Sequence, residues 1–369
     1  MDGVFRRDPA DFGDGVEDQL EPLRSLDLKD TEDFDQLLRQ MAMTAFTGRR
    51  LGEAAEVLTE MITDPDCLLV GTFSGAMTVA KMGLLICDMI DWGWLDIIVS
   101  TGALMAHGFV EAAGMVHFKH DDRLDDDALY HRGYNRVYDT LELEKNLDRT
   151  EGIIRGILHG MNTSEPLGSE GFCRELGEWL AENSDQPGIL RNAYLKGVPV
   201  YIPAFTDSEL ALDVATWMVK EVLASEPEMD LMEALGRVSI PFNPFLDLSS
   251  YTRRVLKAER LGIFTIGGGV PRNWSQQVSP YLEILQERCM RSLPLKKFHY
   301  GVRICPEPAH WGGLSGCTYS EGVSWGKFVA PRDGGRFAEV LCDATVAWPI
   351  LVKAVKQRLD KGKRTPDFG

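Results

Sequence analysis

CLLVGTF, residues 67–73, decides the fold, and MTVAKMGLLICDMI (77–90) follows it with apolar residues at helical spacing. The alternation then repeats, because LDIIVSTG (95–102) is strand-like and ALMAHGFVEAAG (103–114) is helix-like. Strands that are apolar throughout and separated by helices are typical of a parallel sheet covered on both faces. We therefore predict an α/β protein built on such a sheet.

The same alternation continues to the end of the chain. The further predicted strands are VPVYIPAF (198–205), IFTIGGG (263–269), YGVRIC (300–305) and EVLCDA (339–344). Helices are predicted over 209–223, 275–290 and 347–359, and the stretches 33–46 and 51–62 predict an N-terminal helical extension. We expect residues 1–30 to form an arm, residues 31–369 to form a single domain, and the polar stretch 117–136 to be a surface excursion.

Composition excludes several classes of protein. The 369 residues carry a formal charge of −17, which argues against a nucleic-acid partner. No run approaches the roughly 20 apolar residues of a membrane span, and the acidic start lacks a signal-peptide core. Seven scattered cysteines without a CxxC motif are expected to be free thiols. We expect a cytoplasmic protein without a membrane anchor.

Small, hydroxylated or acidic residues gather where the predicted strands end. In a doubly wound sheet the ligand binds at the carboxyl ends of the strands, so these residues are candidate contacts for phosphate or ribose. Ser74, Thr101 and Asp207 also suit the N-caps of the next helices, and this alternative stays open for each. Gly267, Gly268 and Gly269 allow close backbone approach, although the spacing is not GxGxxG.

One polar stretch contains residue types that bind metals. His117, His120, Asp121 and Asp122 lie in it, without a second distant pair at convincing spacing. We expect a solvated loop here and no metal site.

The segment EGVSWGK (321–327) carries the most specific chemistry. An indole beside a lysine removes water from the amine, and desolvation lowers the pKa of an ammonium group. A neutral amine can attack a carbonyl or imine carbon and form a Schiff base. Glu321 is placed to hold an ammonium group or to move protons. The alternative is an edge strand on which Lys327 is merely exposed.

EGVSWGK resembles the active-site segment of the deoxyhypusine synthase family, and IGGGVPRNW (266–274) resembles its NAD-binding glycine segment. CDATVAWPILV (342–352) and FTD (205–207) resemble further cofactor segments, so the likeness extends over nearly the whole chain. The resemblance implies a Rossmann-like fold, a homotetramer, NAD as cofactor and spermidine as donor of an aminobutyl group. The acceptor amine is then a protein lysine, as in a translation factor, or putrescine.

The resemblance also implies roles for individual residues. Lys327 would carry the aminobutyl group as an imine, Trp325 would lie against the carbon chain, and Glu321 would lie near an amine. The residues expected to line NAD are Ser74, Thr78, Thr101, Gly102, Asp207, Gly267, Gly269, Asp343 and Ala344. Those expected to contact the polyamine are Asn273, Asp213 and Ser315.

Several positions depart from the eukaryotic pattern of the family. Ala106 and His107 stand where eukaryotic members have paired glutamates, and Asn273 stands where they have a histidine. No carboxylate precedes Ser315-Gly316, and Asp213 follows Asp207 one residue later than usual. These differences fit a bacterial or archaeal branch. Two alternatives therefore remain, a non-catalytic protein that binds NAD or polyamine and a simple NAD-dependent amine dehydrogenase.

Overall fold

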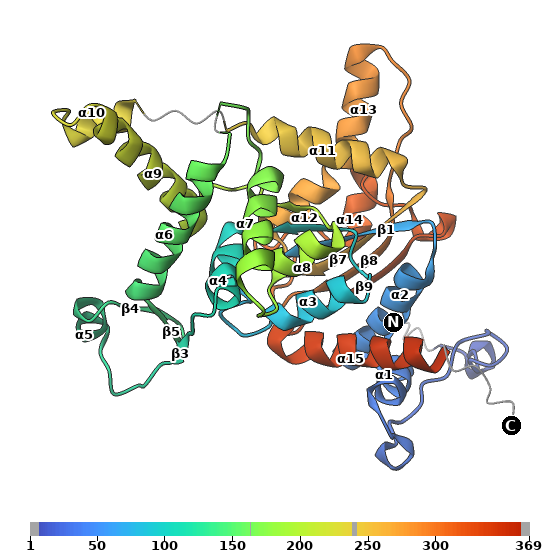
Figure 1. The fold of residues 1–369 in the computed structure, drawn as a ribbon. Coiled ribbons are helices and arrows are strands. Elements are labelled where there is room, and N and C mark those ends of the chain that lie inside the picture. Colours follow the sequence, from blue (N-terminus) through green and yellow to red (C-terminus); the bar gives the residue numbers. More distant parts are fainter. Residues whose placement is uncertain (1–6, 163, 238–241, 363–369) are drawn as a thin grey trace, which may run out of the picture.

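The protein is described by a computed structural model that covers residues 7–162, 164–237 and 242–362. Its centre is a six-stranded sheet in which all neighbouring strands pair in parallel (Figure 1). The strands are β1 (Cys67–Phe73), β2 (Ile97–Ser100), β6 (Val200–Tyr201), β7 (Arg260–Ile266), β8 (Phe298–Ile304) and β9 (Arg336–Val340). The prediction of an α/β fold with a parallel sheet is confirmed.

The order of the strands is β6-β2-β1-β7-β8-β9. Counted along the chain within this sheet, that order is third, second, first, fourth, fifth, sixth, which is the doubly wound arrangement of Rossmann folds. The direction of winding reverses between β1 and β7, which pair along their full length from Cys67–Arg260 to Phe73–Ile266. The loops after these two strands therefore diverge and leave a crevice at their carboxyl ends.

Helices cover both faces of the sheet, because adjacent residues of a strand point to opposite sides. Leu69 and Phe73 of β1 join the core on one face, whereas Val70 joins the core on the other. The first face is covered by α2 (Phe46–Thr63), α3 (Gly83–Asp91), α4 (Gly102–Ala112), α7 (Ser169–Asn183), α8 (Ile189–Lys196) and α15 (Ala344–Gly362). The second face is covered by α11 (Pro244–Lys257), α12 (Gly269–Gln276), α13 (Val278–Cys289) and α14 (Tyr319–Ser324).

The polar excursion after α4 has a regular structure of its own. Its strands are β3 (Phe118–Lys119), β4 (Tyr134–Val137) and β5 (Thr140–Leu143), which form a small antiparallel sheet in the order β3-β5-β4. The accompanying helices are α5 (Asp126–His131), α6 (Glu144–Gly160), α9 (Glu209–Ser225) and α10 (Leu231–Gly236). Figure 1 shows this group projecting to one side of the main sheet. The sequence predicted an excursion here but not a second sheet.

The N-terminal part includes the predicted helical extension. Residues 7–30 are almost entirely exposed and contain only the short 3-10 turns Pro9–Asp11 and Leu28–Asp30. Helix α1 (Phe34–Ala42) then packs on α15, where the buried carboxylate of Asp35 accepts from Arg358 at 2.7 Å. The division into an arm and a single domain remains a prediction.

Local differences from the predicted elements have simple causes. The helix predicted over 77–90 begins only at Gly83, because residues 77–81 form turns that seat Thr78 under α4. The helix predicted over 275–290 is two helices that meet at Gln277. The strand predicted over 198–205 is reduced to Val200–Tyr201 at the edge of the sheet.

Two compositional expectations can be compared with the structure. All seven cysteines are free, as predicted, and burial raises the pKa of the Cys67 and Cys87 thiols to about 12. Among the described helices, none has both the length and the apolar character required to cross a membrane.

Candidate active site

The crevice between β1 and β7 brings together several of the residues expected to bind a cofactor. The backbone N–H of Ser74 donates to the Ile266 carbonyl at 3.1 Å, which ties the end of β1 to the end of β7. The Ser74 hydroxyl contacts the Gly268 carbonyl, and Thr101 Oγ1 donates to the Gly75 carbonyl at 2.6 Å. The ends of β1, β2 and β7 thus form one continuous edge.

Gly102 and Asp207 extend this edge toward β6. Helix α4 begins at Gly102, where an added Cβ would lie 3.4 Å from the Asp207 carbonyl and would overlap Ser208. The side chain of Asp207 is exposed at the end of the loop that follows β6. An exposed carboxylate beside a close backbone crossing is a suitable acceptor for sugar hydroxyls.

The three glycines after β7 have different roles. Gly267 and Gly269 adopt the left-handed backbone conformation, with φ of 81° and 56°, which favours glycine. Gly268 has an extended backbone, and a Cβ there would overlap the carbonyl of Ser315. The turn therefore needs glycine for its own packing as well as for access to a ligand. It delivers the N-terminus of α12, with its free N–H groups, to the crevice.

The remaining expected cofactor residues have structural contacts. Thr78 is buried, and its hydroxyl donates to the Leu104 carbonyl at 2.8 Å, which supports α4. Asp343 caps α15 by accepting from the Thr345 N–H at 2.7 Å, and Ala344 is the first residue of that helix. Their contacts within the described residues join them to α4 and α15, not to the glycine turn.

Lys327 follows the short helix α14 and is fixed by its own backbone. Its N–H donates to the Gly322 carbonyl at 3.1 Å, and its carbonyl accepts from Phe298 at the start of β8 at 3.0 Å. The side chain is only 6% exposed, and Nζ donates to Asn273 Oδ1 at 3.1 Å. The alternative of an exposed lysine on an edge strand is therefore wrong.

The environment of Lys327 favours the neutral amine. Burial lowers the pKa of Lys327, and the nearby Arg272 guanidinium lowers it further, against the opposing effects of Cys317 and Glu321. The Trp325 ring centroid lies 5.9 Å from Nζ, while the ring itself is 62% exposed. A lysine with a lowered pKa beside an accessible apolar wall is suited to nucleophilic attack on an imine or carbonyl carbon.

Two buried arginines that the sequence analysis missed connect the crevice with the lysine. Arg303 Nε donates to the Gly267 carbonyl at 2.9 Å, and Arg303 Nη2 donates to the Ser315 carbonyl at 2.8 Å. Arg272 Nη1 donates to the Cys317 carbonyl at 2.7 Å and its guanidinium lies over the Tyr319 ring. The detectable signal was a charged residue, Arg303, inside the apolar strand YGVRIC.

The other predicted site residues divide between two places. Asn273 and Ser315 lie on the segments around Lys327, although the Ser315 hydroxyl donates to the Glu307 carbonyl at 3.2 Å. Glu321 is exposed in the first turn of α14, and its N–H donates to Thr318 Oγ1 at 3.1 Å.

Asp213 lies apart from these residues, on α9. Its Oδ2 is buried and has no hydrogen-bond partner among the described residues. Burial, together with Glu209 and Glu151, raises the pKa of Asp213 to about 7, while Lys220 opposes this shift. An unpartnered carboxylate in acidic surroundings is suited to receiving a cationic group.

Comparisons with known proteins agree over almost the whole chain. A family model described as Deoxyhypusine synthase matches residues 36–355. A probable deoxyhypusine synthase of Archaeoglobus fulgidus is 32% identical over 311 residues, covering 84% of this chain and 94% of that protein. One from Methanosarcina acetivorans is 31% identical over 351 residues, covering 95% and 99%. A deoxyhypusine synthase-like protein of Chlorobaculum tepidum is 31% identical over 319 residues, covering 85% and 84%.

A solved structure supports the fold independently. The crystal structure of a proposed deoxyhypusine synthase from Entamoeba histolytica superposes with a TM-score of 0.56 at 14% identity. The match covers 90% of this chain and 96% of that one. At this identity the likeness shows the fold alone.

The buried position of Lys327 gives a prediction about its titration. After reductive methylation with a ¹³C label, the Lys327 signal should titrate at lower pH than that of exposed Lys257, because desolvation disfavours the ammonium form. Nuclear magnetic resonance across a pH series measures both midpoints, and Lys327→Arg identifies the signal. A Lys327 midpoint equal to or above that of Lys257 would contradict the assigned environment.

Proposed function

Because the chain belongs to the deoxyhypusine synthase family, we propose that it is an aminobutyl transferase in which Lys327 carries the transferred group. The observation that supports this most directly is the burial of the Lys327 amine beside Asn273 and Trp325, with its pKa lowered. Spermidine is the donor that the family suggests. Retention of the lysine disfavours a simple amine dehydrogenase, because hydride transfer alone needs no Schiff base.

We propose NAD as the cofactor of this reaction. The left-handed Gly267 and Gly269, the hydroxyls of Ser74 and Thr101, and exposed Asp207 fit a dinucleotide across the crevice. When bound, NAD would supply the hydride acceptor that converts the donor amine to an imine and later returns the hydride. The resemblance adds Thr78, Gly102, Asp343 and Ala344 to the proposed cofactor residues.

The residues of the chain then account for the transfer step. The neutral Lys327 amine attacks the imine carbon of the oxidised donor, and the bond from that carbon to the nitrogen of diaminopropane breaks. The four-carbon unit is then held on Lys327 as an imine until an acceptor amine displaces it. Trp325 excludes water from the carbon chain, and Glu321 is placed to hold or move a proton.

The acceptor is a protein lysine or putrescine. Ala106, His107, Leu314 and Asn273 provide fewer carboxylates for a polyamine than the eukaryotic pattern of the family does. Asp213 supplies one unpartnered carboxylate that remains suited to an ammonium group. The acceptor therefore has to be found by offering both kinds of amine.

The surroundings of Lys327 support assembly into a homotetramer. Trp311, Leu314 and Trp325 are 63%, 78% and 62% exposed on the segments next to the lysine. Large apolar side chains grouped at a reaction site are suited to coverage by a second subunit. With a charge of −17, the protein is proposed to act in the cytoplasm without nucleic acid.

Replacement of Lys327 should separate chemistry from binding. Lys327→Arg should retain the fold and NAD affinity but lose aminobutyl transfer, because arginine cannot supply a neutral nucleophile. Mass analysis of products formed from NAD, spermidine and either putrescine or a translation-factor protein measures the loss. The exposed-site control Lys257→Arg should remain active. Full transfer activity in Lys327→Arg would exclude the proposed role.

Replacement of Asp207 tests the cofactor assignment. Asp207→Asn should weaken NAD binding by about tenfold to a hundredfold, because a charged hydrogen bond to the ribose is lost. Calorimetric titration with NAD measures the affinity, and Asp185→Asn, another exposed aspartate, is the matched control. If both variants bind NAD like the parent protein, Asp207 does not contact the cofactor.

The pKa of Asp213 predicts how polyamine binding depends on pH. Below about pH 7 this carboxyl is protonated, so spermidine affinity should rise by about tenfold from pH 6 to pH 8 as it ionises. The charged groups that act on it are Glu209 and Lys220 on α9 and Glu151 on α6. Calorimetry on the NAD-loaded protein should show this rise in the parent protein and not in Asp213→Asn. A rise of the same size in both proteins would assign the pH dependence to another group.

A further inference from the structure

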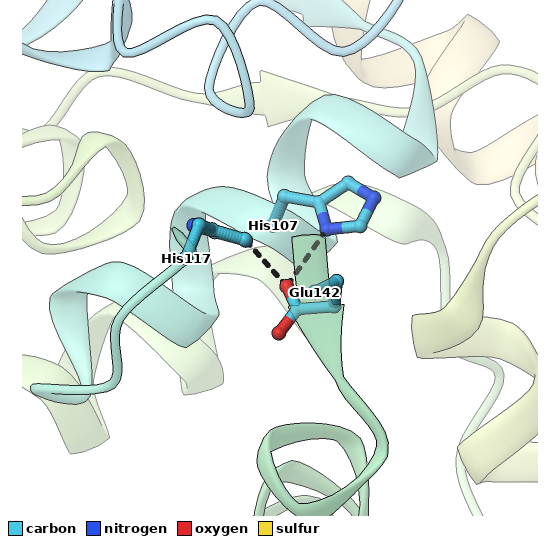
Figure 2. A group of neighbouring side chains, drawn as sticks. All are labelled: His107, His117 and Glu142. Carbon is cyan, nitrogen blue, oxygen red and sulfur yellow. Dashed lines mark hydrogen bonds and ion pairs between the residues drawn. The ribbon is translucent and has the colours of Figure 1, made fainter. Parts of the chain in front are cut away.

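A cluster of three metal-ligating side chains lies outside the residues used above. His107 projects from α4, His117 precedes β3, and Glu142 lies on β5 (Figure 2). One nitrogen of each ring and one carboxylate oxygen all lie within 4.8 Å of one another. The cluster therefore joins the small antiparallel sheet to the helix that starts at the crevice.

The cluster is buried from most sides. The side chains of His117 and Glu142 are 0% and 2% exposed, and that of His107 is 19% exposed. His107 Nδ1 lies 3.2 Å from Glu142 Oε2, which His117 Nε2 also contacts. A single carboxylate oxygen therefore faces two imidazole nitrogens, with access from solvent on the His107 side.

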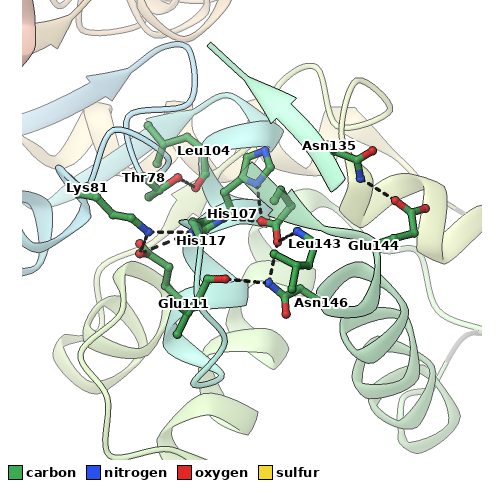
Figure 3. Close-up of polar contacts among 12 residues, drawn as sticks. Thr78, Lys81, Leu104, His107, Glu111, His117, Asn135, Leu143, Glu144 and Asn146 are labelled. Carbon is green, nitrogen blue, oxygen red and sulfur yellow. Dashed lines mark hydrogen bonds and ion pairs between the residues drawn. The ribbon is translucent and has the colours of Figure 1, made fainter. Parts of the chain in front are cut away.

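Surrounding residues hold the carboxylate in this orientation. Glu142 Oε1 accepts from the Leu143 N–H at 2.9 Å and from Asn146 Nδ2 at 2.8 Å (Figure 3). Because both donors are on Oε1, Oε2 is left to face the histidines. Such outer contacts are typical of residues that position metal ligands.

The far side of the His117 ring is also supported. Its Nδ1 lies 2.9 Å from Lys81 Nζ and 3.7 Å from Glu111 Oε1. With a metal on Nε2, the proton of a neutral ring resides on Nδ1, where Glu111 is the acceptor. Lys81 is 47% exposed and keeps its own ion pair with Glu111.

The contacts within the cluster leave one buried atom unsatisfied. Among the described residues, His117 Nε2 has no partner in hydrogen-bonding geometry, although it touches the carboxylate of Glu142. Buried polar atoms are nearly always paired, so an unpaired nitrogen aimed at a carboxylate needs an explanation. A cation between the two groups satisfies both.

We propose that His107 Nδ1, His117 Nε2 and Glu142 Oε2 bind a divalent transition-metal ion of the zinc class. Two imidazoles and one carboxylate suit such ions, and metal bonds of about 2.1 Å place tetrahedral ligands about 3.4 Å apart. The 3.2 Å separation of His107 from Glu142 is close to this value, and His117 moves slightly away from the carboxylate. Three protein ligands leave a fourth position open toward solvent for water or another ligand.

The sequence analysis expected a solvated loop around His117 and no metal site. His117 instead turns inward, while Asp122 of the same stretch points to solvent with a fully exposed side chain. The ligands lie ten and twenty-five residues apart along the chain, so no short motif marks them. Only the packing of the small sheet on α4 brings them together.

Metal titration of the full chain tests the proposal without any assay of activity. Protein stripped with a chelator should bind one equivalent of Co²⁺ with visible absorption of a low-coordinate site, and Zn²⁺ should displace it. His117→Gln and Glu142→Gln should weaken this binding by about a hundredfold or more. His131→Gln, which alters an exposed histidine on α5, should bind like the parent protein.

Two results would overturn the proposal. The first is a parent protein that binds neither ion with a dissociation constant below about 100 μM, which would leave the cluster as an ion pair. The second is unchanged Co²⁺ binding in His107→Gln, whose side chain is partly exposed and tolerates replacement. Because the parent titration decides by itself, a variant that fails to fold does not protect the proposal.

Discussion

The parallel pairing of β1 with β7 is the constraint on which the rest of the structure depends. It places the first and fourth strands of the sheet side by side, so their following loops turn to opposite faces. The buried hydroxyls of Thr72 and Thr265 meet across the pair at 2.8 Å, next to the end of the strands. The crevice is therefore a consequence of strand order, and the glycine turn lies in it because it follows β7.

Arg303 carries this geometry from the crevice to the lysine. It is 3% exposed on β8 and donates to carbonyls of the glycine turn and of the loop before α14. The same strand begins with the Phe298 N–H that accepts no freedom for Lys327, since it binds the lysine carbonyl at 3.0 Å. Strand β8 thus sets the spacing between the proposed cofactor and the proposed covalent catalyst.

The fold could be predicted from the sequence because unbroken apolar strands and periodic helices are local patterns. The strand-end residues Ser74, Thr101 and Gly267 could be predicted for the same reason, since a parallel sheet places all strand ends at one edge. The arginine contacts and the His107–His117–Glu142 cluster could not, because they depend on packing between segments distant in the chain. The family resemblance identified Lys327, but only the structure shows its burial against Asn273.

Trapping the covalent intermediate tests the central claim most directly. Borohydride added while the protein turns over NAD and spermidine reduces an imine to a stable amine, and peptide mapping locates the added mass. The account predicts a four-carbon amine adduct on the peptide that contains Trp325 and Lys327. A reproducible adduct on a different lysine, or no adduct on a protein that completes the transfer, would contradict it.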